Sequence, residues 1–459
     1  MSARADRKTS LVAATLFFVA LWAFFQFVFP YHLAFKERYV LFMSDPSWLA
    51  TYFTKPAPLS FIAGDWLTQF FLLPGVSALV TTALLAVFWA GCRRLIGLWA
   101  FLPVALLAFI ILSPEVPLAV LVAACVFIWL FALALRIRNK VLRYVTVVLL
   151  AVLLVPTARS LNATARIEKP SLEREYDYRI HFKAASGRWD AVEKMGRRNP
   201  HQSLVAAYYY NLSQARAGKL PDGLLKAYQP TWHGLFIPVK PGVECFKLMA
   251  STDALYLAGD YAQAQHSAML GMTFSPRQRS AAMIKWLADI VFANGDYDTA
   301  RRYLTMLSKT ALYRKWAKDG LHLLEAEADR LAVRNDCRDI LVQHNDYRTA
   351  LANITGTASD GKTATDYLLC LDLLDKDLAH FRQDYDAFYK GKHDVIRVPD
   401  LYQEALLMTF DENTSPAAQL TEYGISRTTL DNCTEFLKGN EKLFKTSYWY
   451  YHKYAQPAQ

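Results

Sequence analysis

The sequence lacks the residue patterns on which most catalytic and metal sites depend. Its six cysteines include no C-x-x-C pair, its ten histidines include no H-E-x-x-H pair, and no G-x-S-x-G nucleophile motif occurs. We therefore predict no catalytic residue, no metal site and no bound cofactor. The 459 residues are nevertheless enough for two or three domains.

Acidic residues are scarce in the first third of the chain. Residues 1–160 hold 5 Asp/Glu against 13 Lys/Arg, a net charge of +8, whereas residues 161–459 hold 36 against 38, a net charge of +2. Cations that flank apolar segments meet the anionic headgroups of lipids. The excess positive charge therefore predicts contact with a lipid bilayer, and it does not predict nucleic-acid binding, which needs a basic face on a soluble element.

Long apolar runs are absent after residue 158 and fill the chain before it. An uncharged helix of about 20 residues crosses a hydrocarbon layer of ~30 Å. We expect an all-α protein in which residues 1–158 form a transmembrane domain and residues 159–459 a soluble helical domain. The sequence predicts about five transmembrane helices, over residues 11–30, 76–92, 97–112, 118–135 and 142–158.

The cations between these runs predict how the chain is oriented. They precede the first span and follow the second and fourth, so the positive-inside rule places the N-terminus in the cytoplasm. Five spans then place residues 159–459 in the periplasm of a Gram-negative cell, with the protein in the inner membrane. If residues 60–73 also crossed the bilayer, instead of forming a re-entrant or interfacial helix, the C-terminal side would be inverted.

Asp65 and Gln69 are polar residues within this apolar 60–73 segment. A carboxylate at membrane depth is costly, which makes Asp65 a candidate functional group. The alternative is an interfacial helix in which Asp65 stays hydrated, and Pro74-Gly75, which would end such a helix, favours it.

A turn signature recurs in the second part of the chain. Gly259-Asp260-Tyr261 with Ala264 is repeated 36 residues later as Gly295-Asp296-Tyr297 with Ala300. Glycine supplies a left-handed turn residue, the aromatic ring fits between two helices, and the small alanine lets them approach. Two further copies are Asn345-Asp346-Tyr347 with Ala350 and Gly187-Arg188-Trp189. The pattern resembles tetratricopeptide repeats and predicts a degenerate solenoid of α-hairpins, because the spacing is irregular.

The order of these features is similar to that of an uncharacterised family of Bacteroidota membrane proteins. The segments that carry the resemblance are Gly64–Phe71, Tyr402–Leu407 and Tyr448–Tyr451. The resemblance covers nearly the whole chain and implies an N-terminal set of spans followed by a repeat-like helical region. It implies no activity.

Two further patterns have competing interpretations. Residues Gly356–Thr363 match the phosphate-binding pattern G-x-x-x-x-G-K-[ST], but the preceding residues read as helix and not as the strand this loop needs, so we expect no nucleotide. Aromatic side chains cluster at Tyr208, Tyr209 and Tyr210 and around Trp449. They are either anchors for a protein partner or, as we favour, packing within helical hairpins.

Four cysteines lie in the second part of the chain, namely Cys245, Cys337, Cys370 and Cys433. If this part is exported, they allow three pairings, and the sequence does not choose among them.

These observations predict a membrane-anchored helical-repeat scaffold that binds a protein partner in the cell envelope. A second hypothesis is a membrane enzyme acting on an envelope polymer or a lipid-linked glycan, with Asp45 or Asp65 as its catalytic acid. The chain lacks the paired acidic motif that this chemistry would need.

Overall fold

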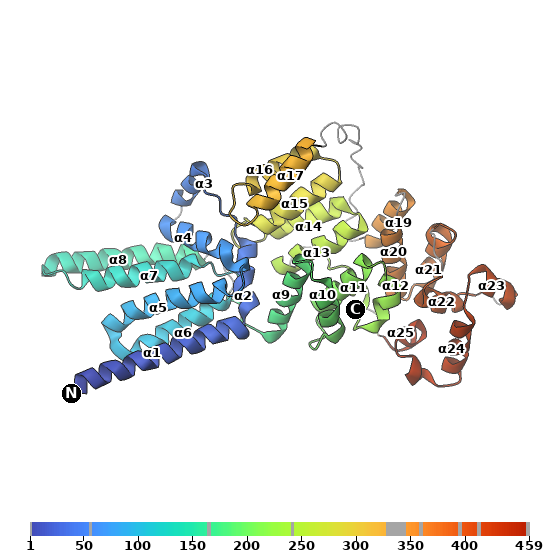
Figure 1. The fold of residues 1–459 in the computed structure, drawn as a ribbon, viewed down its shortest axis with the longest axis horizontal. Helices are drawn as coiled ribbons and strands as arrows, with labels where there is room; N and C mark the ends of the chain where they lie inside the picture. The colour runs from blue at the N-terminus through green and yellow to red at the C-terminus, as the bar shows by residue number, and fades with distance from the viewer. Residues whose placement is uncertain are drawn as a thin grey trace. The chain divides into compact units, whose positions relative to one another are not determined.

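Helices dominate the computed structural model, which describes residues 2–54, 57–162, 167–239, 243–326, 346–357, 361–392, 397–410 and 415–455 (Figure 1). No strand occurs within these ranges, so the all-α prediction is confirmed for them. The chain divides into unit 1, Met1–Tyr178 with Gly271–Asp336, and unit 2, Arg179–Leu270 with Cys337–Gln459. In this division the described residues 271–326 group with the N-terminal helices. The boundary predicted at residue 158, between a membrane part and a soluble part, stays a prediction.

Unit 1 begins with longer helices that are separated by short helical segments. Its N-terminal elements are α1 (Ser2–Phe27), α2 (Pro30–Ala34), η1 (Phe35–Tyr39), α3 (Pro46–Ala50), η2 (Thr51–Thr54), α4 (Pro58–Thr68), η3 (Gln69–Leu72), α5 (Val76–Ile96), η4 (Gly97–Ala100), α6 (Phe101–Leu112), α7 (Ala119–Ala134) and α8 (Lys140–Asn162). The later segment adds α15 (Ala281–Ala293), α16 (Tyr297–Leu307) and α17 (Arg314–Ala326).

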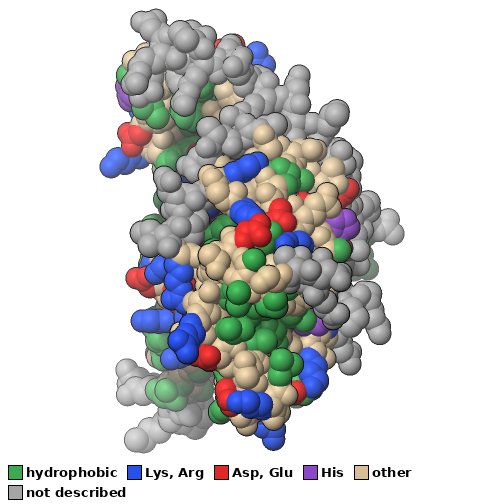
Figure 2. All heavy atoms as spheres, turned by 90° about the vertical axis from the view of Figure 1, so that its right-hand side faces the viewer, with side chains coloured by type: hydrophobic (Ala, Val, Ile, Leu, Met, Phe, Trp, Pro, Cys, Tyr) green, Lys and Arg blue, Asp and Glu red, His purple; other side chains and the backbone are tan. Residues whose placement is uncertain are grey.

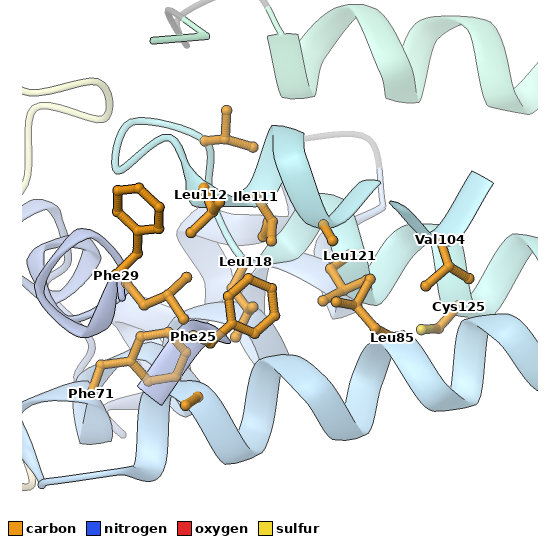
Figure 3. Packing of buried hydrophobic residues seen from close by; sticks show 14 residues of the cluster. Phe25, Phe29, Phe71, Leu85, Val104, Ile111, Leu112, Leu118, Leu121 and Cys125 are labelled. Carbon is orange, nitrogen blue, oxygen red and sulfur yellow. The ribbon is translucent and has the colours of Figure 1, made fainter. Parts of the chain in front are cut away.

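The N-terminal helices share one apolar core (Figure 3). Phe25 of α1, Leu85 of α5, Val104 of α6 and Leu121 of α7 are buried in it. Burial of such side chains stabilises a fold by roughly 1.5–3 kcal/mol each. The core therefore packs these helices into one bundle.

Fewer helices qualify as membrane spans than the sequence predicts. Val76–Leu112 is long and apolar enough to cross a membrane, and the pair Leu11–Phe27 and Pro30–Tyr39, bent by 80°, is a second candidate. Ala119–Ala134 is apolar but shorter. Within Val76–Leu112, α5 ends at Gly97, whose φ of +61° leaves the helical region. The described residues thus supply one or two candidates, and the five-span bundle stays a prediction.

Unit 2 consists of short helices. They are α10 (Trp189–Arg198), α11 (Leu204–Arg216), α12 (Leu220–Gly223), η5 (Leu224–Lys226), η6 (Thr231–Gly234), α13 (Cys245–Ala258), α14 (Tyr261–Thr273), α19 (Tyr347–Thr357), α20 (Lys362–Leu374), α21 (Leu378–Asp384), the π-helical turn η7 (Tyr385–Tyr389), α22 (Asp400–Leu407), α23 (Pro416–Glu422), α24 (Arg427–Leu437), η8 (Glu441–Phe444) and α25 (Tyr448–Tyr454). The chain passes from unit 1 to unit 2 within α9 (Leu172–Ala185), after Tyr178. It returns to unit 1 within α14, after Leu270.

The recurrent turn signature lies between helices. Gly259 has a φ of +85° between α13 and α14, and Gly295 has a φ of +87° between α15 and α16. Ala264 and Ala300 are fully buried where the paired helices approach. Glycine is favoured at both turns because other residues are strained at positive φ.

Aromatic rings pack across the same two turns. The rings of Tyr256 and Tyr261 lie 5.6 Å apart, and those of Phe292 and Tyr297 lie 5.5 Å apart. The two pairs stand at equivalent positions in the 36-residue repeat. Of the looser copies, Gly187 (φ +70°) precedes Trp189 at the start of α10, and α19 begins at Tyr347 with the buried Ala350 in its first turn. Asn345 lies outside the described residues.

A close helix contact in unit 2 yields a test of this packing. Gly196 of α10 faces α11, and a Cβ placed there would lie 2.5 Å from Tyr210 Cβ and 3.0 Å from the Ala206 carbonyl oxygen. Gly196→Ala is therefore expected to lower the free energy of unfolding by about 1–3 kcal/mol, since overpacking forces the helices apart. Thermal unfolding followed by circular dichroism measures the loss.

Gly356→Ala in α19 is the matched control, because its Cβ would meet only Phe388 Cε1, at 3.9 Å. Equal unfolding midpoints for the two variants would contradict the close α10–α11 contact.

Candidate functional site

Polar side chains that are far apart in the sequence meet inside unit 1. We call this cluster the polar junction. Its members come from η1, η2 and α4 at the N-terminal side, from the residues that precede α15, and from the residue that precedes α17. They are Lys36, Glu37, Tyr52, Asp65, Arg277, Arg279 and Tyr313.

The centre of the polar junction is an ion pair between Asp65 and Arg277, which are 212 residues apart. The guanidinium donates hydrogen bonds from Nη1 and Nη2 to the two carboxylate oxygens, and the Tyr52 hydroxyl donates a third at 2.7 Å. The side chains of Asp65 and Arg277 are only 3% and 7% exposed. A bidentate, hydrogen-bonded pair of this kind compensates the cost of burying both charges.

These contacts correct the interpretation of the 60–73 segment. Asp65 is not hydrated as expected, because the carboxylate is buried and paired. Whether residues 60–73 form an interfacial or a re-entrant helix stays a prediction. Gln69 is also buried, and its Nε2 donates to the Trp66 carbonyl oxygen at 3.0 Å. Both polar residues are therefore occupied by contacts within the protein.

Arg279 extends the polar junction through ring contacts. Its guanidinium carbon lies 4.4 Å from the centroid of the Trp48 ring and 5.5 Å from that of Tyr52. Nη2 also donates to Thr51 Oγ1 at 3.4 Å. Cation–π contacts of this kind contribute about 0.5–2 kcal/mol each, depending on exposure. Tyr52 thus contacts both arginines of the loop before α15.

Lys36 and Glu37 hold two further segments. Lys36 Nζ donates to the carbonyl oxygens of Ser113 and Val116, both at 2.6 Å, in the link between α6 and α7. Glu37 Oε1 accepts a hydrogen bond of 2.9 Å from the Tyr313 hydroxyl. One η1 turn therefore fastens both the N-terminal bundle and the later helical segment.

Two contacts outside the polar junction complete this attachment. The Ala281 amide at the start of α15 donates to the Val40 carbonyl oxygen at 3.0 Å. Asp45 accepts from the Ser47 amide at 3.0 Å, which caps α3, and pairs with Lys309 at 2.7 Å. Asp45 is thus a helix cap and an ion-pair partner.

The polar junction offers little space to a ligand. The cavity bordered by Lys36, Asp65 and Arg277 has a volume of about 10 Å³, which holds about one water molecule. A general acid or base must come within hydrogen-bonding distance of its substrate. The arrangement is therefore suited to holding segments together and not to catalysis.

A second buried carboxylate supports the same end of the bundle, and sequence reasoning missed it. Glu175 accepts from the backbone amides of Tyr31 and His32 at 2.8 and 3.0 Å, and from His32 Nδ1 at 2.6 Å. These amides belong to the first turn of α2, whose N–H groups have no partner within the helix. No local sequence signal links a glutamate to a turn more than 140 residues earlier.

The three consecutive tyrosines of α11 do not form a partner surface. Tyr208, Tyr209 and Tyr210 are at most 1% exposed. Their hydroxyls donate to the Ala250 carbonyl oxygen at 2.7 Å, to Asp253 at 3.1 Å and to the Gly223 carbonyl oxygen at 2.9 Å, respectively. These tyrosines pack within helical hairpins, because each hydroxyl has a hydrogen-bond partner inside unit 2.

Trp449 of the C-terminal helix α25 is also buried, so it too is not a surface anchor. It is 5% exposed, and its Nε1 donates to the Glu404 carbonyl oxygen at 3.0 Å. The Glu404 carboxylate accepts from the Tyr448 amide at 2.6 Å. Burial raises the pKa of Glu404 to about 7, and the Tyr448 hydrogen bond opposes this rise. One glutamate of α22 thus holds the start of α25.

The remaining motifs of the sequence fit no nucleotide or metal site within the described ranges. Lys362, the lysine of the phosphate-binding pattern, is at the start of α20 and pairs with Asp366 at 2.9 Å. Residues 358–360 of the pattern lie outside the described residues. Among described residues, no three His, Cys, Asp or Glu side chains converge as metal ligands.

No cysteine pairing is visible in the part of the chain that is described. Cys370 and Cys433 are free thiols, and burial raises the pKa of both. Cys245 is buried at the start of α13. Cys337 lies outside the described residues.

The chain belongs to a family of unknown function, DUF6057, whose family model matches residues 7–161 and 157–455. This membership fits the expected resemblance to an uncharacterised family. No curated protein sequence and no solved structure matches the chain.

The ion pair at the centre of the polar junction can be tested by mutation. Arg277→Leu leaves the Asp65 carboxylate buried without its cation, so the free energy of unfolding is expected to fall by about 3–5 kcal/mol. Asp65→Leu combined with Arg277→Leu should recover most of this loss, because neither charge of the pair is then left buried. Thermal unfolding of the full chain in detergent micelles measures both.

Arg397→Leu, which breaks an ion pair whose side chains are 62% and 60% exposed, is the control and should have little effect. A double variant less stable than Arg277→Leu alone would contradict this account of the pair.

The raised pKa of Glu404 predicts a pH dependence of stability. Between the ordinary glutamate pKa of 4.5 and about 7, the folded state keeps a proton that the unfolded state has lost. Stability from this group is therefore present below pH 4.5 and falls as the pH rises to 7. Glu404→Gln removes this titration. The unfolding temperature of the variant minus that of the natural chain should therefore be larger at pH 8 than at pH 5.

Melting curves of the two proteins at both pH values give this difference, in which the titrations of all other groups cancel. A difference that is constant with pH would show that Glu404 does not titrate in this range.

Proposed function

We propose that this protein is a membrane-anchored helical scaffold, in which N-terminal helices lie in the bilayer and helical hairpins present a surface to a protein partner. The observation that carries the proposal is the exposure of apolar side chains along the N-terminal helices. Leu79, Leu102, Leu106 and Val152 are each 62–72% exposed. Water-soluble monomers rarely expose large contiguous apolar surfaces, whereas lipid contact makes such exposure favourable.

The polar junction supports the anchoring role. It fastens the hairpin of α15 and α16 to the N-terminal bundle through Asp65–Arg277 and Glu37–Tyr313. A hairpin attached in this way keeps a fixed position on a membrane anchor. Stacked α-hairpins commonly present extended binding surfaces, and this supports a scaffold.

The surface of the C-terminal helices is compatible with a protein partner. Figure 2 shows an apolar area bordered by Lys, Arg, Asp and Glu side chains on one face. Protein interfaces commonly combine an apolar centre with a polar rim. We propose a tetratricopeptide-like repeat architecture for this part of the chain, a multi-pass location in the inner membrane, a cytoplasmic N-terminus and a periplasmic C-terminal domain.

The geometry does not favour the enzymatic hypothesis. Asp65 is bound by Arg277 and Tyr52, and Asp45 caps α3 and pairs with Lys309. A catalytic acid needs a proton to give and a substrate within reach. The contacts of both aspartates instead join them to other groups of the protein itself.

Fractionation and topology mapping test the anchor. We expect the protein to stay in the membrane pellet after an alkaline carbonate wash, because apolar helices hold it without help from charge. Alkaline phosphatase fused after residues 165 and 459 should be active, and after residues 94 and 140 inactive. Release by carbonate would contradict the anchor, and a silent C-terminal fusion would indicate an additional crossing at residues 60–73.

Site-specific photocrosslinking in intact cells tests the scaffold. A photoreactive residue at the exposed Met269 of α14 or Leu430 of α24 should form a discrete adduct with another protein. The fully buried Tyr209 is the control position. Absence of adducts from every exposed position on the C-terminal helices would contradict a partner surface there.

A further inference from the structure

An apolar groove lies between α1 and α5 in unit 1, and the two helices contact each other. Its volume is about 500 Å³. Phe18 and Trp22 of α1 line one wall, and the small residues Ala83, Ala86 and Ala90 line the other. Almost no polar atom contributes to the surface, so an occupant must be a hydrocarbon.

The length of the groove matches half of a bilayer. On α5 it runs from Leu79 to Ala90, eleven steps along the helix, which rise about 16 Å. The hydrocarbon core of a bilayer is ~30 Å thick. The groove therefore covers about one leaflet.

The groove is too narrow to enclose a second helix. A volume of about 500 Å³ over about 16 Å gives a mean cross-section of about 30 Å². An α-helix with side chains is about 10 Å across, which needs roughly 80 Å². A single extended acyl chain is the apolar group of membranes that is narrow enough.

Two arginines stand at one end of the groove. Arg93 and Arg94 follow Ala90 by one helical turn, at the end of α5. The guanidinium of Arg93 lies 5.0 Å from the Trp89 ring centroid, and that of Arg94 lies 4.2 Å from the Trp129 ring centroid. Trp129 is itself fixed, because its Nε1 donates to the Val87 carbonyl oxygen at 3.1 Å.

Arginines held against aromatic rings in this way are suited to binding a phosphate. Ring contacts hold the planar guanidinium by its face and leave its N–H edge to donate. No acidic partner of Arg93 or Arg94 occurs among the ion pairs of the described residues. A bidentate guanidinium–phosphate contact would supply the missing negative charge.

We propose that the groove binds one acyl chain of an anionic phospholipid and that Arg93 and Arg94 bind its phosphate. This site rests on the proposed membrane anchoring. A lipid bound there fills the space between α1 and α5 and places the end of α5 at the headgroup level. The bilayer thereby becomes a structural component of the anchor.

Native mass spectrometry of the full chain in nanodiscs tests the site. The probes are phosphatidylcholine alone and phosphatidylcholine mixed with phosphatidylglycerol. On release from mixed nanodiscs, the natural chain should retain one phosphatidylglycerol with at least about tenfold preference over phosphatidylcholine, because only the former has a net negative charge.

Two variants separate the headgroup from the chain. Arg93→Gln with Arg94→Gln should abolish the preference and leave one lipid of either kind bound. Ala86→Phe fills the groove and should remove the retained lipid altogether.

Matched controls alter equivalent features elsewhere. Arg136→Gln with Arg138→Gln removes two exposed cations after α7, and Leu102→Phe enlarges a side chain of α6 that is 72% exposed. Both controls should retain phosphatidylglycerol like the natural chain. Lipid retention by Ala86→Phe would overturn the proposal, and so would an unchanged preference in the arginine variant. A dimer of the natural chain that retains no lipid would also overturn it, because a second copy and not a lipid would then cover the groove.

Failure of the site is distinguishable from failure of the anchor. A chain that does not enter nanodiscs contradicts the proposed membrane anchoring. A chain that enters them and retains no lipid contradicts only the lipid site.

Discussion

The burial of one charged pair constrains the whole of unit 1. Asp65 and Arg277 are each too costly to bury alone, and both side chains are almost fully buried in the folded protein. Their pairing therefore requires α4 and the loop before α15 to occupy fixed positions. The neighbouring hydrogen bonds connect the same segments: Tyr52 donates to Asp65, Arg279 donates to Thr51, and Tyr313 donates to Glu37. The attachment of the later hairpin to the N-terminal bundle follows from this electrostatic requirement.

The sequence predicted the features that depend on neighbouring residues. Helical periodicity predicted the all-α class, and the Gly259 and Gly295 signatures mark the ends of helices because positive φ is a local property of the backbone. Asp65 was also recognised, since a carboxylate in an apolar segment is unusual. The structure places Gly259 and Gly295 in turns between helices and Asp65 in a buried ion pair.

The sequence does not predict which residues pair over long distances along the chain. Arg277 is 212 residues from Asp65, and nothing in its local setting distinguishes it from the many other cations of the second part. Tyr208–Tyr210 were ambiguous for the same reason, because tyrosine suits both surfaces and interiors until the partners of its hydroxyl are known. Those partners, at Ala250, Asp253 and Gly223, come from other helices. The association of residues 271–326 with the N-terminal helices likewise depends on such distant contacts.

In the intact protein, α15 is fastened to the segment after η1 by the hydrogen bond between Ala281 and Val40. Cysteine crosslinking in native membranes tests this most directly, with Val40→Cys and Ala281→Cys in a chain whose natural cysteines are replaced by serine. The Ala281 amide hydrogen-bonds the Val40 carbonyl oxygen at 3.0 Å, which brings the two positions within the range of a disulfide. The account predicts rapid, near-complete crosslinking within one chain under mild oxidation. No crosslink, with both thiols present and reactive toward a small reagent, would contradict it.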